Sequence, residues 1–141
     1  MQIGVESAKA VDDRRVFVVD EDEITSAALQ FMLHDEIETH EIPTLDAAYE
    51  KAKEWKPHVL MLGESIVRKG GIGLLTEIRS KLSDLKIILV ADTATDPFIK
   101  DCLKNGANSV LARPLTIEKA RQKVDAQLGR SAKLSIPVQI A

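Results

Sequence analysis

The sequence predicts an α/β protein in which helices cover both faces of a five-stranded parallel sheet. Five short apolar runs alternate with stretches that have the 3.6-residue periodicity of amphipathic helices. Four of these runs are continuously apolar, which is typical of strands buried on both faces. The connections between them are short, and right-handed crossovers then favour a single doubly wound domain with the strand order 2-1-3-4-5.

The expected strands are short and hydrophobic. They span residues 16–19, 37–42, 59–62, 87–91 and 109–112. The second run differs from the others because apolar and polar residues alternate from Ile37 to Ile42. Alternation indicates one buried and one exposed face. We therefore place this strand at an edge of the sheet, where the order 2-1-3-4-5 also puts it.

Each expected helix has an apolar stripe that we predict packs on the sheet. In chain order the stripes are Ile24, Ala27, Ala28, Phe31 and Met32; Leu45, Ala48, Tyr49 and Ala52; Leu75, Ile78 and Leu82; Phe98, Ile99, Cys102 and Leu103; and Ile117, Ala120, Val124 and Leu128. Thr44 and Thr116 are the expected N-caps of the second and fifth helices. Asn105-Gly106 and Gly129 are expected to end the fourth and fifth helices.

Composition limits the location and the partners. The chain has 141 residues, 45% apolar and 29% charged, as in an ordinary soluble domain. Its apolar runs are too short to span a bilayer. Cys102 is the only cysteine and permits no internal disulfide, so we expect a cytoplasmic location. A net charge of −3 gives no general attraction to nucleic acid or to an anionic membrane.

We expect the chain to divide into three segments. Residues 1–13 are predicted to be a flexible N-terminal segment, residues 14–129 the folded domain and residues 130–141 a C-terminal tail. In the tail, Ile136, Val138 and Ile140 alternate with other residues. That pattern suits either a strand added to the sheet edge of a partner or a disordered chain end.

Charged residues gather where the expected strands end. The first strand is followed by Asp20–Asp22, the third by Gly63–Ser65 and the fifth by Arg113–Pro114. The C-terminal ends of parallel strands lie at one edge of the sheet, where ligands of such folds bind. The acidic run suits a divalent cation, and it equally suits the capping of the helix that follows.

Three segments resemble the receiver domains of bacterial response regulators. Gly106–Pro114 is similar to the family segment Gly-Ala-x-x-[Tyr/Phe]-[Leu/Ile]-x-Lys-Pro. Residues 57–62, with Gly71 beyond them, resemble the third strand and the loop after it, and Val18–Glu21 resembles the strand that carries an acidic pair. The spacings fit from about Arg14 to Leu128. The resemblance implies a flavodoxin-like (βα)5 fold and a role in two-component or phosphorelay signalling.

The same resemblance implies that the phosphorylation pocket is altered. Gly63 falls where the family has its phospho-accepting aspartate, and glycine has no nucleophile. Val90 replaces the hydroxyl residue that would bond the phosphoryl oxygens, and Val110 replaces the switch aromatic. Arg113 replaces the lysine and keeps its charge with a different reach and geometry. These changes predict a degenerate receiver, or pseudo-receiver.

Part of the pocket is retained. Asp20 and Glu21 match the acidic pair, and Pro114 matches a proline whose peptide bond is commonly cis in the family. A metal site would keep Glu21 and the carbonyl of Ser65, so we expect no cofactor beyond weakly bound Mg²⁺. We expect Arg113 to pair with Asp20 or Glu21, because buried carboxylates need a partner.

Glu64 stands next to the vacant acceptor position. If the strand continues through it, its side chain points away from Asp20. If the chain bends at Gly63, Glu64 turns toward the pocket, where pairing with Arg113 would imitate a phosphorylated state. Residues 68–71 are expected to form a flexible basic loop beside the site.

The leading functional prediction is a protein–protein interaction module of a signalling pathway, not an enzyme, that acts without phosphorylation. The resemblance places its output surface, also the family's dimerisation surface, on the fourth helix, fifth strand and fifth helix. The residues predicted there are Val110, Lys100, Lys104, Lys119 and Lys123. The lysines suit an acidic protein partner, and the same surface suits a homodimer.

Two alternatives remain open. One is a receiver phosphorylated at a non-standard residue such as Glu64. The other is a haloacid-dehalogenase-like phosphatase in which Asp20 is the nucleophile and Asp22 the general acid. The phosphatase is disfavoured, since the connections are too short for a cap domain and Arg113 and Asp92 are poor substitutes for its other catalytic residues.

Overall fold

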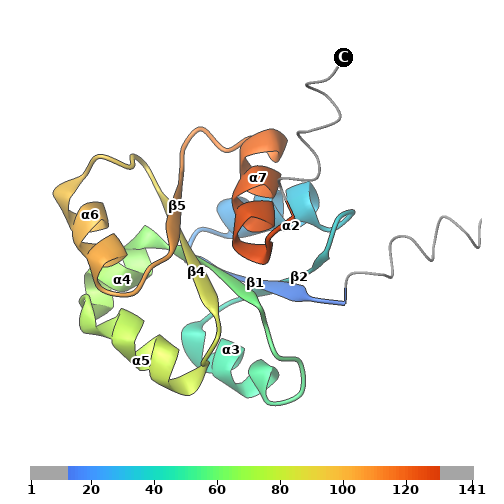
Figure 1. Cartoon of the computed structure of the whole chain (residues 1–141), viewed down its shortest axis with the longest axis horizontal. Coiled ribbons are helices and arrows are strands. Elements are labelled where there is room, and N and C mark those ends of the chain that lie inside the picture. The colour runs from blue at the N-terminus through green and yellow to red at the C-terminus, as the bar shows by residue number, and fades with distance from the viewer. Residues whose placement is uncertain (1–12, 131–141) are drawn as a thin grey trace, which may run out of the picture.

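The computed structural model describes residues 13–130, in which five parallel strands form one sheet flanked by six helices (Figure 1). The strands are β1 (Arg15–Val19), β2 (Glu38–Ile42), β3 (Val59–Gly63), β4 (Lys86–Ala91) and β5 (Ser109–Ala112). The helices are α2 (Glu23–Leu33), α3 (Leu45–Ala52), α4 (Glu64–Gly70), α5 (Gly73–Lys81), α6 (Pro97–Lys104) and α7 (Ile117–Leu128). Apart from Asp13 and Arg130, the predicted N-terminal segment and tail lie outside the described residues. Between residues 13 and 130, no helix is long and apolar enough to cross a membrane.

The sheet has the order β2-β1-β3-β4-β5 with every pair parallel, so the predicted fold class and topology are confirmed. The predicted edge position of β2 is confirmed as well. The prediction of one buried and one exposed face is wrong, however: Thr39 and Ile42 point to opposite faces and are both buried, while Glu38 and Glu41 are exposed. The other four strands carry the continuous apolar runs.

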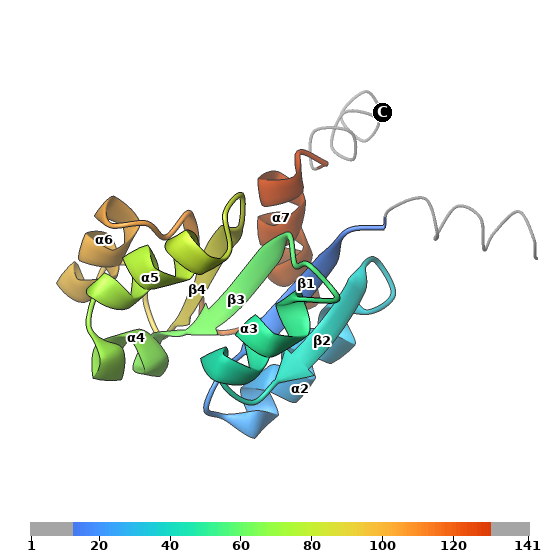
Figure 2. The same ribbon diagram turned by 90° about the horizontal axis from the view of Figure 1, so that it is seen from below.

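Two hydrophobic cores lie on the two faces of the sheet. Phe17 and Leu60 point toward the layer of α3, α4, α5 and α6, whereas Val18 and Met61 point toward α2 and α7 (Figures 1 and 2). Successive strand residues serve opposite faces, so each central strand contributes to both cores. Each large side chain buried in this way contributes about 1.5–3 kcal/mol. This packing fixes the strand ends that form the site.

The predicted helix ends are confirmed where the caps are specific. Thr44 and Thr116 accept the backbone N–H groups of Ala47 and Lys119, each at 3.1 Å. Gly129 ends α7 with a φ of 77°, a conformation that costs glycine little. These local signals set the register of the helices over the sheet.

The segment between β3 and β4 contains two helices where one was expected. The chain turns directly from β3 into α4, which buries Val67, and Gly71 with a φ of 87° separates α4 from α5. The prediction of a flexible basic loop at residues 68–71 is wrong for Arg68–Gly70, which form the last turn of α4. The buried Val67 supplies the apolar anchor that makes this short helix stable.

The predicted apolar stripe of α2 is also wrong. Ile24 and Phe31 are 79% and 67% exposed, and the buried face instead carries Thr25, Leu29 and Leu33. Those three follow the i, i+4, i+8 spacing of one helix face. The hydroxyl of Thr25 donates to the capping residue Asp22 at 2.8 Å, which directs this face inward.

Candidate functional site

A cavity of about 510 Å³ lies where β1, β3, β4 and β5 end, at the edge of the sheet that the sequence indicated. It is lined by Asp20, Glu21, Asp22, Glu64, Ser65, Arg68, Val90, Ala91, Asp92 and Arg113. Every predicted pocket residue except Gly63 is in this lining, and Gly63 forms the end of the central strand beneath it.

The carboxyl group of Asp20 lies over Gly63. A Cβ atom added at Gly63 would be 2.6 Å from Cγ and Oδ2 of Asp20 and 2.9 Å from Oδ1, too close for a real side chain. Oδ1 of Asp20 also accepts the backbone N–H of Asp22 at 2.9 Å, which holds the carboxyl group in place. Asp20 therefore occupies the space that a side chain at position 63 would need.

Burial dominates the electrostatics of Asp20. It raises the pKa of this carboxyl group, although the N–H of Asp22 and the positive charge of Arg113 act in the opposite direction. Asp20 is thus a partly desolvated acid inside the pocket.

Arg113 pairs with Asp92 and not with the acidic run. Its Nε is 3.2 Å from Oδ1 of Asp92, and a second guanidinium nitrogen donates to the hydroxyl of Thr25 at 3.0 Å. The positive charge of Arg113 acts to lower the pKa of Asp20, but the two side chains form no ion pair of 4 Å or less. The expected pairing with Asp20 or Glu21 is therefore not formed, because Thr25 draws the guanidinium toward α2. The peptide bond between Arg113 and Pro114 is cis, as expected.

Glu21 is neutralised by a lysine from α4. Its Oε2 lies 2.8 Å from Nζ of Lys69, and this contact and a hydrogen bond from Ser65 lower the pKa of Glu21. Asp22 is used as the N-cap of α2, where it accepts the N–H of Ile24 at 3.1 Å. The capping interpretation of the acidic run thus holds for Asp22.

These carboxylates do not fit a divalent cation well. Each has a protein partner or lies against Gly63, and Mg²⁺ needs free oxygen ligands in octahedral geometry. Among residues 13–130, no three His, Cys, Asp or Glu side chains are grouped so as to hold a metal ion.

Glu64 turns into the pocket because α4 begins at this residue, directly after Gly63. Its side chain is 17% exposed. Oε1 accepts the backbone N–H of Asp92 at 3.2 Å, and Oε2 accepts Nε–H of Arg68 at 2.7 Å. Of the two arrangements open from the sequence, the bend at Gly63 is the one observed. The partner of Glu64 is Arg68, however, and not Arg113.

Arg68 extends this network to α6. One of its terminal nitrogens lies 2.7 Å from Oδ2 of Asp96, the N-cap of α6. Arg68 was expected beside the site, but in a loop, and Asp96 was missed. Glu64 and Arg68 have the i, i+4 spacing of a helical ion pair, and Asp96-Pro97 is a typical helix start. The expectation of a loop at residues 68–71 hid the first signal.

The residues predicted for the output surface differ in their exposure. Lys100 and Lys104 are exposed on α6. The ammonium group of Lys119 is instead bonded to the carbonyls of Ala112 and Pro114, at 2.8 and 2.9 Å. The two other residues predicted there, Val110 and Lys123, are half-buried. Val90, predicted to replace the hydroxyl residue, is buried in the pocket wall.

Comparison with known proteins gives a consistent result. The model of the response regulator receiver domain matches residues 16–125. The transcriptional regulatory protein KdpE of Staphylococcus aureus is 25% identical over 113 residues, which cover 78% of this chain and 48% of that protein. A probable chemotaxis protein CheY of Rhizobium etli is 31% identical over 77 residues, 52% of this chain and 60% of that protein.

This chain thus spans about half to three fifths of the length of these curated relatives. Among solved structures, a two-component response regulator from Clostridium difficile has a TM-score of 0.72 at 22% identity, with 84% of this chain and 98% of that chain covered. At that identity the likeness concerns the fold.

Proposed function

Because this chain belongs to the response regulator receiver domain family, we propose that it is a pseudo-receiver, a non-enzymatic protein interaction module of two-component signalling that works without phosphorylation. The observation that carries this proposal is the arrangement at Gly63. The residue has no nucleophile, and the Asp20 carboxyl group fills the space where an acceptor side chain would stand.

The other parts of the pocket support the same conclusion. Phosphoryl transfer needs positioned cations and donors around the transferred group. Here Glu21 is neutralised by Lys69, and Arg113 is engaged with Asp92 and Thr25. Val90 offers no hydroxyl group. Lys69 and Arg113, the cations near Glu21 and Asp20, are therefore already engaged with groups of the protein.

The surface of α6, β5 and α7 suits a protein partner. Leu103 on α6 and Ile117 on α7 are 37% and 40% exposed, and Lys100 and Lys104 are exposed on α6. Apolar contacts with a charged rim are typical of transient interfaces. The proposed partner carries an apolar patch with acidic residues around it, and a second copy of the chain is the alternative occupant.

The test is to incubate the protein with Mg²⁺ and acetyl phosphate and to measure its intact mass, beside a working receiver as control. We expect no added phosphoryl group. A gain would overturn the phosphorylation-independent function. If the mass gain then disappeared in Glu64→Gln or in Asp20→Asn, the substituted residue would be the acceptor.

The same sample tests the phosphatase alternative. We expect no hydrolysis of p-nitrophenyl phosphate in the presence of Mg²⁺. Turnover that Asp20→Asn abolishes would support a phosphatase and contradict the assignment as an interaction module.

A further inference from the structure

We propose that Glu64, Arg68 and Asp96 form a permanent clamp that holds the loop between β4 and α6, and with it the start of α6, in one arrangement. This inference rests on the proposed function in one respect, that no phosphoryl group arrives to do the same work. The clamp itself is a property of contacts in the structure and can be tested separately.

The first half of the clamp fixes the beginning of the loop. Glu64 is the first residue of α4, so its carboxylate is placed by the turn at Gly63 and is largely shielded, with 17% of the side chain exposed. Its Oε1 accepts the backbone N–H of Asp92, the first residue after β4, at 3.2 Å. A carboxylate that accepts a backbone N–H makes a stronger bond than a neutral acceptor.

The second half fixes the end of the loop. Arg68, one turn further along α4, donates to Oε2 of Glu64 at 2.7 Å and to Oδ2 of Asp96 at 2.7 Å. The other oxygen of Asp96 accepts the N–H of Phe98 at 2.8 Å and caps α6. The guanidinium carbon also lies 4.3 Å from the centre of the Phe98 ring. Arg68 therefore ties α4 to the first turn of α6 by an ion pair and a cation–π contact.

The two halves bracket the five-residue stretch from Asp92 to Asp96. A single exposed ion pair is worth little, but a network that shares one forked guanidinium loses less side-chain entropy per contact. The contacts to Arg68 raise its pKa further, so the charge stays in place at any physiological pH. The positive charge that joins Glu64 and Asp96 is therefore retained.

The clamp bonds the loop that, by resemblance, responds to phosphorylation in a receiver. By resemblance, the hydroxyl residue at the end of β4 links this loop to the phosphoryl group of a receiver. Val90 cannot make that link. Glu64, the residue after Gly63, instead bonds the same loop through the backbone N–H of Asp92. The surface that begins at α6 is therefore held in one state by the protein's own residues.

The clamp is tested by amide hydrogen exchange, followed by NMR, in wild type and in Arg68→Met. Methionine keeps an apolar stem against Phe98 and removes the bridging charge. We expect exchange of the Asp92 and Phe98 amides to accelerate about threefold or more, while amides of β1 and β3 stay unchanged. Lys53→Met, which breaks the exposed pair between Lys53 and Glu50, is the matched control and should leave both amides unchanged.

Unchanged exchange at Asp92 and Phe98 in Arg68→Met would overturn the clamp. If Arg68→Met does not fold, Asp96→Asn gives the same test at Phe98, because the amide oxygen still caps α6 while the ion pair is lost. A phosphoryl mass gain together with the accelerated exchange would overturn the phosphorylation-independent function and leave the clamp standing. No mass gain together with unchanged exchange would support the phosphorylation-independent function and overturn the clamp.

Discussion

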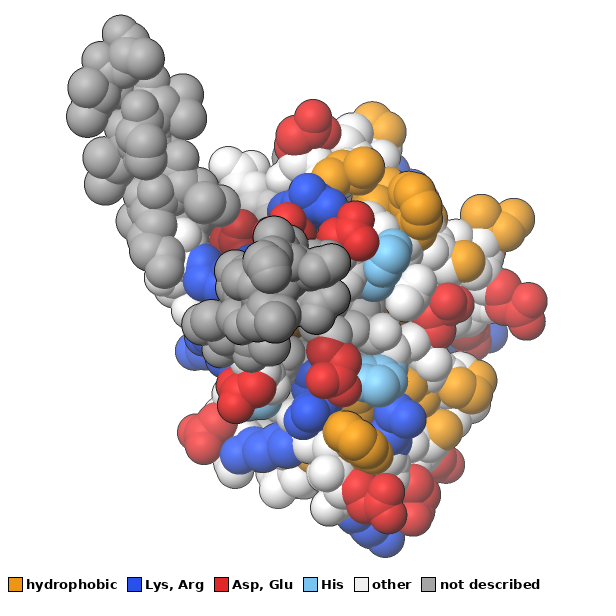
Figure 3. Space-filling model, turned by 90° about the vertical axis from the view of Figure 1, so that its right-hand side faces the viewer, with side chains coloured by type: hydrophobic (Ala, Val, Ile, Leu, Met, Phe, Trp, Pro, Cys, Tyr) orange, Lys and Arg blue, Asp and Glu red, His pale blue; other side chains and the backbone are white. Residues whose placement is uncertain are grey.

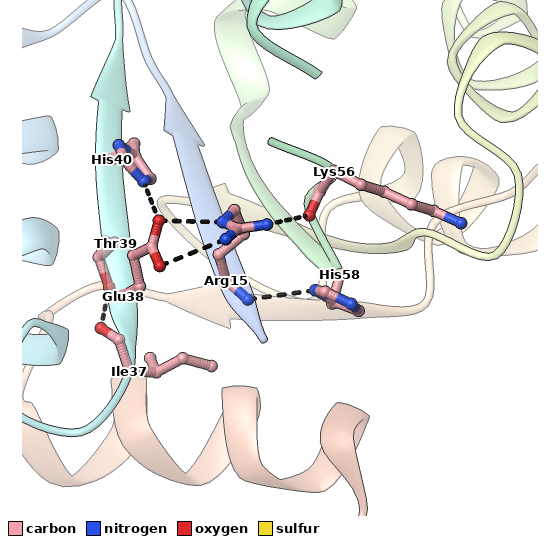
Figure 4. A network of polar contacts seen from close by, with 7 residues as sticks. All are labelled: Arg15, Ile37, Glu38, Thr39, His40, Lys56 and His58. Carbon is pink, nitrogen blue, oxygen red and sulfur yellow. Dashed lines mark hydrogen bonds and ion pairs between the residues drawn. The ribbon is translucent and has the colours of Figure 1, made fainter. Parts of the chain in front are cut away.

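At the N-terminal end of the sheet the charged side chains form one network centred on Arg15, whereas at the C-terminal end several ion pairs surround a cavity. Nε of Arg15 lies 2.9 Å from Oε2 of Glu38, and NH1 donates to the carbonyl of Lys56 at 3.2 Å (Figure 4). The same oxygen of Glu38 lies 2.6 Å from Nε2 of His40. The backbone N–H of Arg15 donates to Nδ1 of His58 at 3.1 Å.

The side of the molecule that carries β2 has charges of both signs at its surface. In Figure 3 acidic and basic side chains lie beside one another there, without a large area of one sign. The pocket end is different. Asp20 has Gly63 beneath it and no ion pair, and Arg113 bonds to Asp92, whose side chain is 86% exposed.

The comparison indicates that the two ends contribute differently to stability. The side chain of Arg15 bonds to Glu38 of β2 and to the carbonyl of Lys56 before β3, so the network at that end stabilises the sheet. The ion pairs around the pocket are more exposed, so we expect each of them to contribute less to stability. Removing an ion pair at the N-terminal end should therefore lower the free energy of unfolding more than removing one at the pocket.

The largest effect is expected for Gly63→Val. Its side chain would overlap the carboxyl group of Asp20, and the strain should lower the free energy of unfolding by about 1–3 kcal/mol. Urea denaturation measures the change. Gly73→Ala is the control, since a Cβ there has no atom within 4 Å, and it should not destabilise.

The double variant Asp20→Ala/Gly63→Val should recover most of the stability that Gly63→Val loses, because the overlapping group is gone. Additive losses from the two changes would contradict the steric explanation.

A smaller effect is expected for Arg15→Met. It removes three charge-assisted hydrogen bonds, two to Glu38 and one to the carbonyl of Lys56, from a side chain that is 17% exposed, and should cost about 1–2 kcal/mol. Arg113→Met at the other end breaks an exposed pair and should cost less than about 1 kcal/mol. If urea denaturation showed the same loss of unfolding free energy for both variants, the two ends would not differ in their contribution to stability.

The smallest effect concerns pH. Burial, and then the positive charges of Arg15, Arg14 and Lys56, lower the pKa of His58 below its ordinary value of 6.5. The folded protein thus prefers the neutral ring, whose Nδ1 accepts the Arg15 N–H. This stabilisation is complete above pH 6.5 and is lost as the pH falls through the lowered pKa.

His58→Gln should flatten this part of the stability profile, measured by thermal unfolding at several pH values. Retention of the full pH dependence in His58→Gln would show that another group is responsible.

The fold could be predicted from the sequence because it depends on patterns that are local and redundant. Five apolar runs, the alternation in β2 and two threonine caps each pointed to the same topology. The meeting of Asp20, Gly63 and Arg113 followed from the rule that parallel strands end at one edge of the sheet.

The errors arose where partners are chosen by tertiary contacts. Helix α2 offers two apolar stripes, and the inward one includes Thr25, which is polar in the sequence and satisfied only in the fold. Arg113 has several carboxylates within reach, and Thr25 decides between them. The turn at Gly63 into α4 depends on the burial of Val67, which periodicity over so short a segment does not reveal.

The most direct test of the central claim observes the pocket itself. Amide resonances of Gly63, Glu64 and Asp92 are followed by NMR while Mg²⁺ and then beryllofluoride, a mimic of the acyl phosphate, are added. We predict no saturable shift at these three residues, because no acceptor carboxylate stands at position 63. Saturable shifts centred on them would contradict the account and identify a working phosphorylation site.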